Sequence, residues 1–410
     1  MSSSIESSDD VKRNACQIAW RSLAQDQPQN AAEVLRPFAE QTIEDEELAR
    51  VWCAMMGWVD DLDHLERELR RLARVWAANS VVVKEMSQAI LRVWGRRAGP
   101  LPFADRESVI GLGVDLLDVC LKESPPSKPD QRAALFLLRA ALLAWAGPLG
   151  DERALNDIEI ALTLTPEDGA GWFQLARLHL LRGRWEKAAF ATEQALSYQF
   201  DELRAGWNLA VALTGYAPHV LSDLRGLNEA WELAGHADFS ESCIVDAQGR
   251  TVALGLERQL VAIHTQMNSL GGWDLDSPWA TEVVWVQPLS PCHGRVLHPT
   301  ASPFPADFDD LILWDPQPVR FETVDGENRP IMSALALLER GKAIVRPLPR
   351  PRLTARQNKM LDERLPQGVF FHQAQDHSTS SGKLCWPRGM VAVDVLSQFE
   401  DAWRDLGLNQ

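Results

Sequence analysis

Tyrosine is nearly absent from this chain, which has 2 Tyr but 16 Trp among its 410 residues. The aromatic content therefore comes mainly from rings that combine a large apolar face with a single N–H donor. Long hydrophobic runs are also missing, because the best candidate, residues 133–147, is too short and is interrupted by Arg139. The sequence therefore predicts no membrane-spanning helix.

Cysteine is sparse, and the six Cys residues stand far apart without a Cys-X-X-Cys motif. No disulfide framework is indicated, and most of these thiols are expected to be small buried apolar groups in a reducing compartment. The opening residues MSSSIESSDDVKR are polar and acidic and lack the apolar core of a signal peptide. We therefore expect a cytoplasmic protein.

Positive charge is in deficit, with 41 Lys and Arg against 57 Asp and Glu and a net charge of -16. This balance disfavours nonspecific binding to nucleic acid or to an anionic membrane surface. The hydrophobic fraction of 46% and charged fraction of 24% are typical of a folded globular protein, and the length allows about two domains. Nucleic acid is therefore an unlikely partner of this acidic, tryptophan-rich chain.

Small and bulky apolar residues recur at a fixed spacing of about 34 residues between positions 150 and 210. The recurring pairs are Ala154 with Ala188, Ala161 with Ala195, Leu162 with Leu196, Leu175 with Leu209 and Ala176 with Ala210. Such a period is typical of stacked helical hairpins, in which small residues allow close helix approach and each hairpin buries its apolar face against its neighbours. The pattern predicts a helical repeat array.

The segment GWFQLARLHLLRG places Trp172, Leu175, Ala176 and His179 where tetratricopeptide repeats favour Trp, Leu, Gly and Tyr. Together with the period, this segment resembles a tetratricopeptide repeat (TPR) array, although Phe200 replaces the usual terminal Pro. The resemblance implies helix pairs stacked into a curved solenoid whose groove holds an extended peptide or a partner's helix. In that groove the repeat geometry suggests five contact residues: Trp172, Arg177, His179, Trp207 and Asn208.

Apolar periodicity predicts further helices near residues 10–25, 29–41, 45–59, 60–79, 82–96, 105–122 and 131–146. We therefore expect about six helical hairpins over residues 10–235, after a flexible acidic N-terminus at residues 1–9. This region contains ten of the 16 Trp, which are expected mainly in the core. Residues 1–235 contain 25 basic and 35 acidic residues, so a groove partner is expected to be basic or apolar.

From about residue 236 to residue 410 the sequence changes to short alternating runs broken by Pro and Gly. A hairpin is predicted over 243–254 and a helix over 257–267, followed by strands in EVVWVQPL, GRVLHPT, DLILWD, PVRFETV and IMSALALLE. A helix over 354–364, a strand GVFFHQA and a terminal amphipathic helix after Val391 complete the pattern. The predicted fold is therefore a TPR-like helical solenoid followed by a smaller α+β domain with an antiparallel sheet or partial barrel.

The string PADFDDLILWDPQPV, residues 305–319, resembles the Pro-Ala-Asp-Leu-Arg-Asp-Leu-Val-Trp stretch of SciE-type accessory proteins of type VI secretion. Those proteins also join a repeat-like helical region to a small C-terminal domain. The match covers a dozen residues and implies no particular activity.

Cys292 and His293 lie in SPCHGRVLHPT, which resembles half of a Rieske iron-sulfur motif. Ser290 replaces the first ligand Cys, and no Cys-X-His box lies upstream, so a Rieske centre is excluded. The two residues could instead act as nucleophile and base, but neighbours on a strand point to opposite faces. We therefore expect no catalytic dyad here.

The C-terminal half contains other His and Cys side chains that are alternative metal ligands. The alternative set is Cys292, His298, His372 and His377. No spacing among them matches a known metal motif, so separate structural roles are expected, with neither metal nor other cofactor.

A basic segment opposes the overall acidity, with eight Lys and Arg between residues 340 and 364 against Asp362 and Glu363. Its proposed anion or partner contacts are Arg346, Arg350, Arg352 and Arg356. Because no aromatic residues are interleaved for base stacking, a solvated linker is favoured over a binding segment, and both interpretations stay open.

These patterns favour a non-enzymatic interaction scaffold or adaptor. Its TPR-like groove would bind a peptide or partner protein, and the β-rich C-terminal module would make a second contact. The alternative is that the C-terminal domain is an enzyme or a metal- or ligand-binding domain for which the helical array recruits substrate. The sequence indicates neither the partner nor the oligomeric state.

Overall fold

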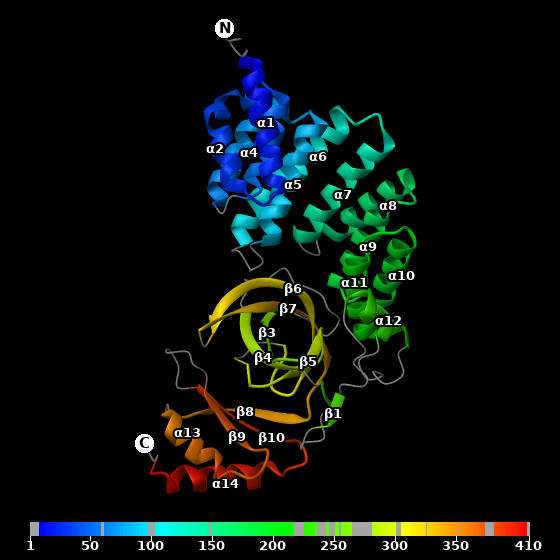
Figure 1. Ribbon diagram of the computed structural model, residues 1–410. Coiled ribbons are helices and arrows are strands. Elements are labelled where there is room, and N and C mark those ends of the chain that lie inside the picture. The colour runs from blue at the N-terminus through cyan, green and yellow to red at the C-terminus, as the bar shows by residue number, and fades with distance from the viewer. Residues whose placement is uncertain are drawn as a thin grey trace. The chain divides into compact units, whose positions relative to one another are not determined.

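A computed structural model gives the fold of the chain (Figure 1). It describes residues 8–58, 61–96, 103–146, 150–216, 225–235, 243–245, 251–253, 256–264, 281–300, 305–324, 326–351, 353–373 and 381–407. The chain forms two compact units, Met1–Leu178 with Phe190–Asp201, and His179–Ala189 with Glu202–Gln410. The domain boundary predicted near residue 236 lies outside the described residues and stays a prediction.

The described residues between 8 and 235 form helices joined by short turns. The helices are α1 (Ser8–Ala24), α2 (Pro28–Leu35), the 3-10 helix η1 (Arg36–Ile43), α3 (Glu46–Met56), α4 (Leu62–Trp76), α5 (Ser80–Arg96), α6 (Phe103–Glu123), α7 (Pro129–Ala146), α8 (Asp151–Leu164), α9 (Gly169–Leu181), α10 (Trp185–Ser197), α11 (Glu202–Tyr216) and α12 (Arg225–Leu233). The predicted helices are confirmed, except that the one expected over 29–41 divides into α2 and η1. Pro37 lies at this division. Because proline lacks a backbone N–H and has a fixed φ, it favours the start of a new helix.

Two helices of the first unit, α3 and α4, begin after an N-capping Asp side chain. The Asp45 carboxylate accepts a hydrogen bond from the Leu48 N–H at 3.0 Å, and Asp61 accepts one from His64 at 3.0 Å. Such caps satisfy backbone donors that the first helical turn leaves without partners. The preference of Asp for this position therefore sets where α3 and α4 begin.

The core of the first unit consists of apolar stripes at helical spacing. On α4 the stripe is Leu65, Leu69 and Leu72, all fully buried. Two of the Trp side chains packed against this core use their indole N–H as well as their rings, since Trp52 donates to Glu68 at 3.1 Å and Trp76 donates to the Thr42 carbonyl at 2.9 Å. Trp therefore packs here and also links neighbouring helices.

A buried ion-pair cluster joins α6, α7 and α8. Arg139 of α7 makes a two-pronged contact with Asp157 of α8, at 2.8 and 2.6 Å. Its third nitrogen donates to Asp118 of α6 at 2.7 Å, and Arg153 also pairs with Asp118. Asp157 is fully buried, so its charge depends on Arg139 for compensation.

Strands dominate the second unit after α12. The elements are β1 (Cys243–Val245), β2 (Thr251–Ala253), β3 (Gln259–His264), β4 (Thr281–Ser290), β5 (His293–Val296), β6 (Leu311–Val324), β7 (Glu327–Glu339), β8 (Ala343–Pro349), α13 (Ala355–Asp362), β9 (Phe370–Gln373), β10 (Ser381–Pro387) and α14 (Ala392–Asp405). The hairpin β1–β2, the strand β9 and the helices α13 and α14 are confirmed at their predicted places.

Strands β3 to β7 form a closed barrel around the fully buried Trp314 (Figure 1). Successive strands pair antiparallel, whereas β3 pairs with β7 in parallel. An up-and-down chain of five strands ends in the direction in which it began, so its closure has to be parallel. The antiparallel sheet or partial barrel that the sequence predicts is thus a closed barrel together with a smaller sheet.

The helix predicted over 257–267 is wrong, because residues 259–264 form β3. Val261 and Ile263 point into the barrel core, while Leu260 and Ala262 pack on its other side with Ile331. Burial on both faces makes the four central residues, 260–263, apolar in succession, and this removes the alternation that identifies a strand.

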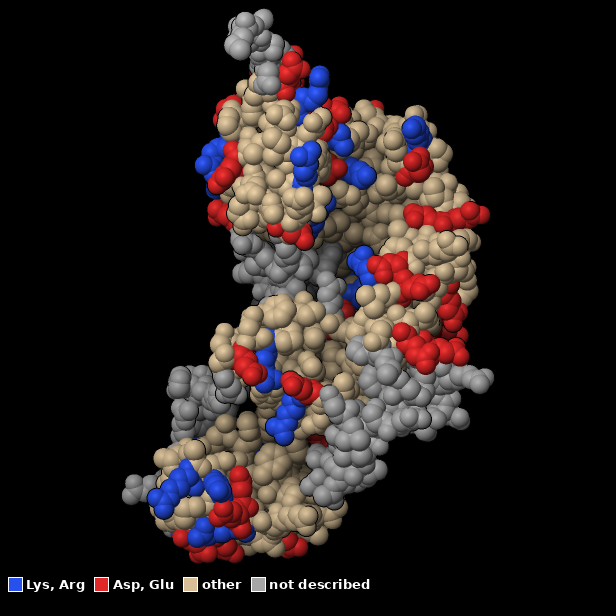
Figure 2. Space-filling model, viewed as in Figure 1, with Lys and Arg blue, Asp and Glu red and all other residues tan. Residues whose placement is uncertain are grey.

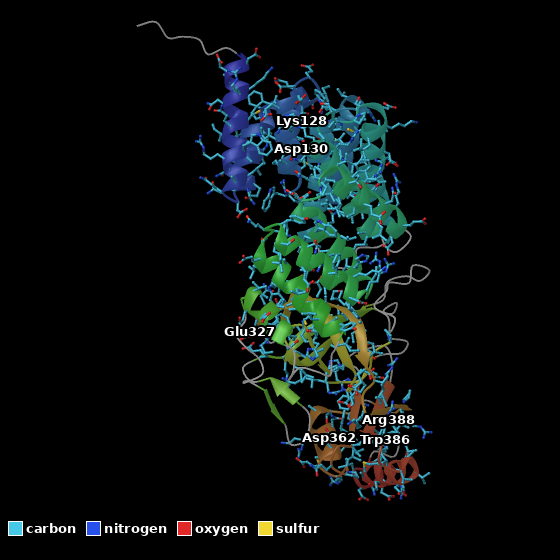
Figure 3. The ribbon with its side chains drawn as sticks, turned by 90° about the vertical axis from the view of Figure 1, so that its right-hand side faces the viewer. Lys128, Asp130, Glu327, Asp362, Trp386 and Arg388 are labelled. Atoms are coloured by element: carbon cyan, nitrogen blue, oxygen red, sulfur yellow. The ribbon has the colours of Figure 1, made fainter. Side chains whose placement is uncertain are left out.

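The strands β8, β10 and β9 form a second sheet, in that order. Helix α14 covers one face, where the Phe371 ring of β9 lies 5.2 Å from Phe399 and 5.6 Å from Trp403 between ring centroids. Trp386 of β10, labelled in Figure 3, belongs to the same cluster. The predicted docking of the terminal helix on the sheet is confirmed, although Val391, which precedes it, is 62% exposed.

Gly382 of β10 lies under the Phe371 ring, and a Cβ at this position would overlap that ring. A glycine is therefore required for the close approach of Phe371.

None of the helices in the described part of the chain is long and apolar enough to span a membrane.

Candidate functional site

The five residues predicted for a groove are divided between the two units. In the first unit, Trp172 is half-buried and its indole N–H donates to the Pro166 carbonyl at 3.0 Å, and Arg177 is half-buried. In the second unit, His179 is buried, and burial lowers the pKa of its imidazole to about 4. A single groove lined by all five residues stays a prediction.

Trp207 and Asn208 follow each other on α11. Asn208 is buried, while the half-buried Trp207 packs edge-to-face on the buried Trp231 at 5.1 Å between ring centroids. Burial of Asn208 and of His179 favours a packing role for both side chains. Trp172, by contrast, contacts an exposed aromatic side chain, Phe190.

An exposed aromatic pair lies on the hairpin of α9 and α10. Phe190 of α10 is 57% exposed, and its ring meets Trp172 of α9 edge-to-face at 6.3 Å. Four of the exposed residues of α8 are Glu152, Asn156, Glu159 and Thr163, and those at the equivalent positions of α10, in the next repeat, are Glu186, Phe190, Glu193 and Ser197. Three of the four positions keep their polar character, so Phe190 is the exception.

Acidic residues lie close in the sequence to both members of this aromatic pair. Glu167 and Asp168 follow Pro166, the residue whose carbonyl binds Trp172, and Glu193 lies one turn after Phe190. Glu167 and Glu193 are exposed and form no ion pair with another described residue. Acidic side chains gather on the face of α8 and α10 seen at the right of Figure 2.

Ser290, Cys292 and His293 come together at the bulged end of β4 and the start of β5. The Ser290 hydroxyl oxygen lies 2.5 Å from Nδ1 of His293 and 3.6 Å from Sγ of Cys292. Ser290 and His293 are paired across the two strands, and Cys292 belongs to the turn that joins them, so strand alternation does not separate the three side chains. Cys292 and His293 are both fully buried.

The buried environment determines the chemistry of Cys292. Burial raises the pKa of its thiol to about 12, against the smaller opposing effects of hydrogen bonds with Ser290 and with Thr214 of α11. The thiol is therefore protonated at neutral pH, whereas a cysteine nucleophile acts as a thiolate. The cluster has the properties of a packed polar core.

His298 and His372, which lie far apart in the sequence, stack ring on ring at the junction of the barrel and the second sheet. Their ring centroids are 5.4 Å apart and their planes differ by 11°. Nε2 of His298 accepts a hydrogen bond from the Trp285 N–H at 3.0 Å, which engages one potential ligand nitrogen. Burial, and then the charges of His298 and Lys383, lower the pKa of His372 to about 4, and burial lowers the pKa of His298.

The alternative metal ligands are therefore only partly brought together. His298 and His372 pair, Cys292 belongs to the separate cluster with Ser290, and His377 lies outside the described residues. Among the residues that the structure describes, no group of three or more His, Cys, Asp and Glu side chains is arranged to hold a metal ion.

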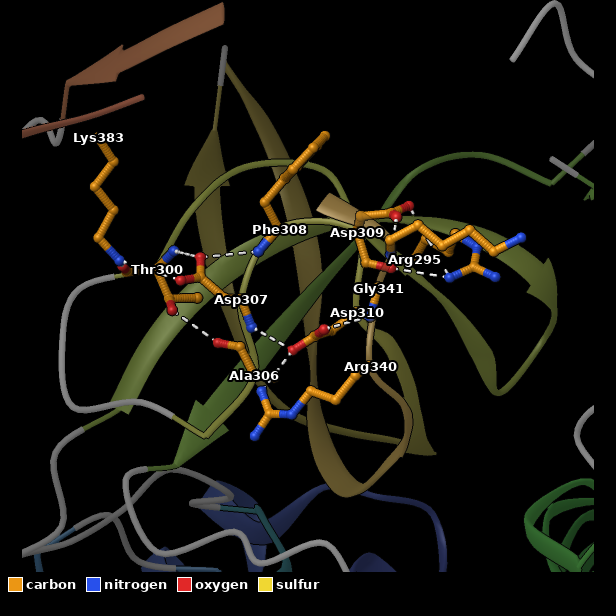
Figure 4. A network of polar contacts seen from close by, with 11 residues as sticks. Arg295, Thr300, Ala306, Asp307, Phe308, Asp309, Asp310, Arg340, Gly341 and Lys383 are labelled. Atoms are coloured by element: carbon orange, nitrogen blue, oxygen red, sulfur yellow. Dashed lines mark hydrogen bonds and ion pairs between the residues drawn. The ribbon is translucent and has the colours of Figure 1, made fainter. Parts of the chain in front are cut away.

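The PADFDD string forms a hydrogen-bonded loop beside this junction (Figure 4). The buried Asp310 carboxylate accepts from the backbone N–H groups of Gly341 at 2.7 Å and Asp307 at 2.9 Å, and from Arg340 at 2.9 Å. Burial raises the pKa of Asp310 despite these hydrogen bonds. Lys383 of β10 reaches across to Asp307, so the loop ties the second sheet to the barrel.

The basic segment is partly used within the second unit. Arg350 pairs with Glu400 of α14 and lies over the Trp403 ring at 5.4 Å. Arg346 and Arg356 are exposed, and Arg352 lies outside the described residues. The four predicted contact residues therefore do not form one uniform surface.

Solved structures that resemble this one over about half of the chain include the following two. One is TTC0263, a thermophilic TPR protein of Thermus thermophilus, with 17% identity and a TM-score of 0.39 over 49% of this chain and 98% of that one. Another is the MamA protein, with 11% identity and a TM-score of 0.30 over 55% of this chain and 88% of that one. No protein-family model and no curated protein matches the chain. The SciE resemblance stays a prediction.

Proposed function

We propose that the protein is an interaction scaffold whose helical array binds a protein segment. The observation that carries this proposal is the exposed pair of Phe190 and Trp172 on a helical repeat, at a position that is polar in the preceding repeat. Large aromatic side chains that combine exposure with a fixed geometry are the usual anchors of protein interfaces.

The candidates for chemistry support binding over catalysis. Cys292 and His293 are fully buried, and the Cys292 thiol is protonated at neutral pH because burial raises its pKa. His298 and His372 are neutral at that pH because burial lowers the pKa of each imidazole. The described Cys residues carry no disulfide, which favours the reducing environment of the cytoplasm.

The C-terminal module supplies the second contact in this proposal. Lys342, Arg346, Arg356 and Lys359 are exposed, and none of them forms an ion pair with a described residue. Arg350 is already paired with Glu400 and does not contribute. The exposed cations suit the acidic surface of a partner that the helical array also holds.

Affinity capture with the full chain tests the scaffold. Wild-type protein, the double variant Trp172→Ala/Phe190→Ala and the control Phe321→Ala are each incubated with native lysate. Phe321 is a suitable control because it is 59% exposed and belongs to strand β6, outside the helices α9 and α10. We expect one or more proteins that the wild type and the control retain and the double variant loses. Equal retention by all three chains would contradict the proposal.

The alternative function, an enzyme or metal- or ligand-binding C-terminal domain, makes a different prediction. It requires stoichiometric zinc or iron that is lost in the variants Cys292→Ala and His372→Ala, or a Cys292 thiol that reacts rapidly with iodoacetamide. The scaffold predicts that Cys292 reacts only after denaturation, because its thiol is buried and protonated. Metal analysis and mass spectrometry of the alkylated full chain distinguish the two functions.

A further inference from the structure

The surface around the exposed aromatic pair has a definite chemistry. We name it the aromatic–acidic patch and define it as Glu167, Asp168, Trp172, Phe190 and Glu193, all in the first unit. It combines two aromatic rings in edge-to-face contact with carboxylates on both α10 and the turn before α9.

The aromatic pair is held in place without being covered. The Trp172 indole N–H donates to the Pro166 carbonyl at 3.0 Å, and its ring supports Phe190 through an edge-to-face contact. Phe190 nevertheless remains 57% exposed, although most of an α-helix's outward stripe is normally polar. An exposed ring in a fixed orientation loses little conformational freedom when a partner binds.

The charged residues near Phe190 indicate which type of partner side chain the aromatic–acidic patch would bind. Glu167 and Glu193 are exposed without an ion-pair partner among the described residues, and Asp168 adds a third carboxylate. Glu186 and Lys187, which precede Phe190 on α10, carry opposite charges, so the acidic balance remains. A side chain that suits both an aromatic face and a nearby carboxylate is the guanidinium of Arg, which stacks on rings and pairs with carboxylates at the same time.

We infer that the aromatic–acidic patch binds an arginine-bearing protein segment, with a guanidinium over the aromatic pair, carboxylates around it and an apolar side chain of the partner beside Phe190. The inference rests on the proposed function, since it names the partner chemistry of the same array. Within the patch, Phe190 on the outward side of α10 is a residue that the groove prediction did not include.

Binding of synthetic peptides to the full chain tests this inference by fluorescence anisotropy. The probes are one short labelled peptide that alternates Arg with Leu and Ala, and the same peptide with every Arg replaced by Lys or by Glu. We expect the Arg peptide to bind more tightly than the Lys peptide, and the Glu peptide not to bind. The variant Phe190→Asn introduces the residue found at position 156 in the preceding repeat. It should lower the affinity for the Arg peptide by about tenfold.

Two further variants separate the ring from the charge. Glu193→Gln should weaken binding of the Arg peptide by about two- to fivefold and reduce its salt dependence, and Phe321→Asn should leave the affinity unchanged. Absence of Arg-peptide binding, equal affinity for the Arg and Lys peptides, or an unchanged affinity in Phe190→Asn would each overturn the inference. If lysate capture still depends on Phe190 and Trp172 in that case, the scaffold stands and only the partner chemistry is wrong.

Discussion

The helical array and the barrel with its second sheet bury polar groups in different ways. In the array, Arg139 of α7 is compensated by the side chains of Asp157 and Asp118 on neighbouring helices. In the second unit, the buried Asp310 is compensated mainly by the backbone N–H groups of Gly341 and Asp307.

The difference follows from the backbone. A helix satisfies its own N–H and C=O groups internally, so only side chains remain to link one helix to another. Turns between strands leave backbone donors available, and a carboxylate can accept several of them. The array is therefore sensitive to single charged side chains, and the second unit to the loops that hold its strands together.

The largest effect is expected at the ion-pair cluster of the array. Replacing Arg139 by Ala leaves the fully buried Asp157 without its counter-charge, which should lower the free energy of unfolding by about 3–5 kcal/mol. Denaturant unfolding followed by circular dichroism at the helix band measures this. Arg153→Ala, at the exposed edge of the same cluster, should cost less than about 1 kcal/mol. Equal effects of the two variants would show that the cluster is not the link we describe.

A smaller loss is expected at the loop of the second unit. Asp310→Ala removes the acceptor of two backbone N–H groups and of Arg340, and should cost about 2–3 kcal/mol. The matched variant Arg340→Ala removes an exposed partner and should cost less than about 1 kcal/mol. Hydrogen exchange of the strands β6 and β7 reports the change locally, and unchanged protection in Asp310→Ala would count against the role of this loop.

Acid should weaken the junction between the barrel and the second sheet. The folded state lowers the pKa of His372 from its ordinary 6.5 to about 4, so the folded chain binds fewer protons than the unfolded chain in this range. Stability from this group is therefore present above pH 6.5 and is lost as the pH falls toward 4. His372→Phe keeps an aromatic ring on His298 and removes the titration.

The wild type should lose about 1–2 kcal/mol more than His372→Phe between pH 6.5 and 4. Thermal unfolding of both chains at several pH values measures the difference, in which the titration of groups that do not interact with His372 cancels. If the stability of both chains changed equally with pH, the titration of His372 would not contribute to the stability of the junction.

The smallest effect on stability is expected at Phe190. Its ring is 57% exposed and the equivalent residue in the preceding repeat is Asn, so Phe190→Asn should change the free energy of unfolding by less than about 0.5 kcal/mol. A loss of about 2 kcal/mol or more in denaturant unfolding would mean that Phe190 belongs to the core of the array.

Much of the array could be predicted from the sequence, because the same local packing recurs from one helical hairpin to the next. The 34-residue spacing also aligns Phe190 with Asn156 of the preceding repeat, so the change from a polar to an aromatic residue is visible in the sequence. Its meaning depends on knowing which side of α10 faces outward. Burial of Asn208 and His179 depends on neighbouring helices and has no local signature.

The second unit was less predictable because its contacts join distant segments. The stack of His298 on His372 forms only when β9 packs beside the barrel, and no spacing in the sequence indicates it. Strand β3 is apolar on both faces, so its residues do not alternate. The PADFDD string was visible as a motif, but its role as a hydrogen-bonded tie depends on Gly341 and Lys383, which lie far along the chain.

Site-specific photo-crosslinking tests most directly the claim that the array holds a partner through its exposed ring. A photoreactive phenylalanine analogue is placed at position 190 in one full-length chain and at position 321 in another, and both are irradiated in native lysate. We predict protein adducts at position 190 whose crosslinked peptides contain Arg, and none of these adducts at position 321. Adducts at position 321 alone, or the same adducts at both positions, would contradict the account.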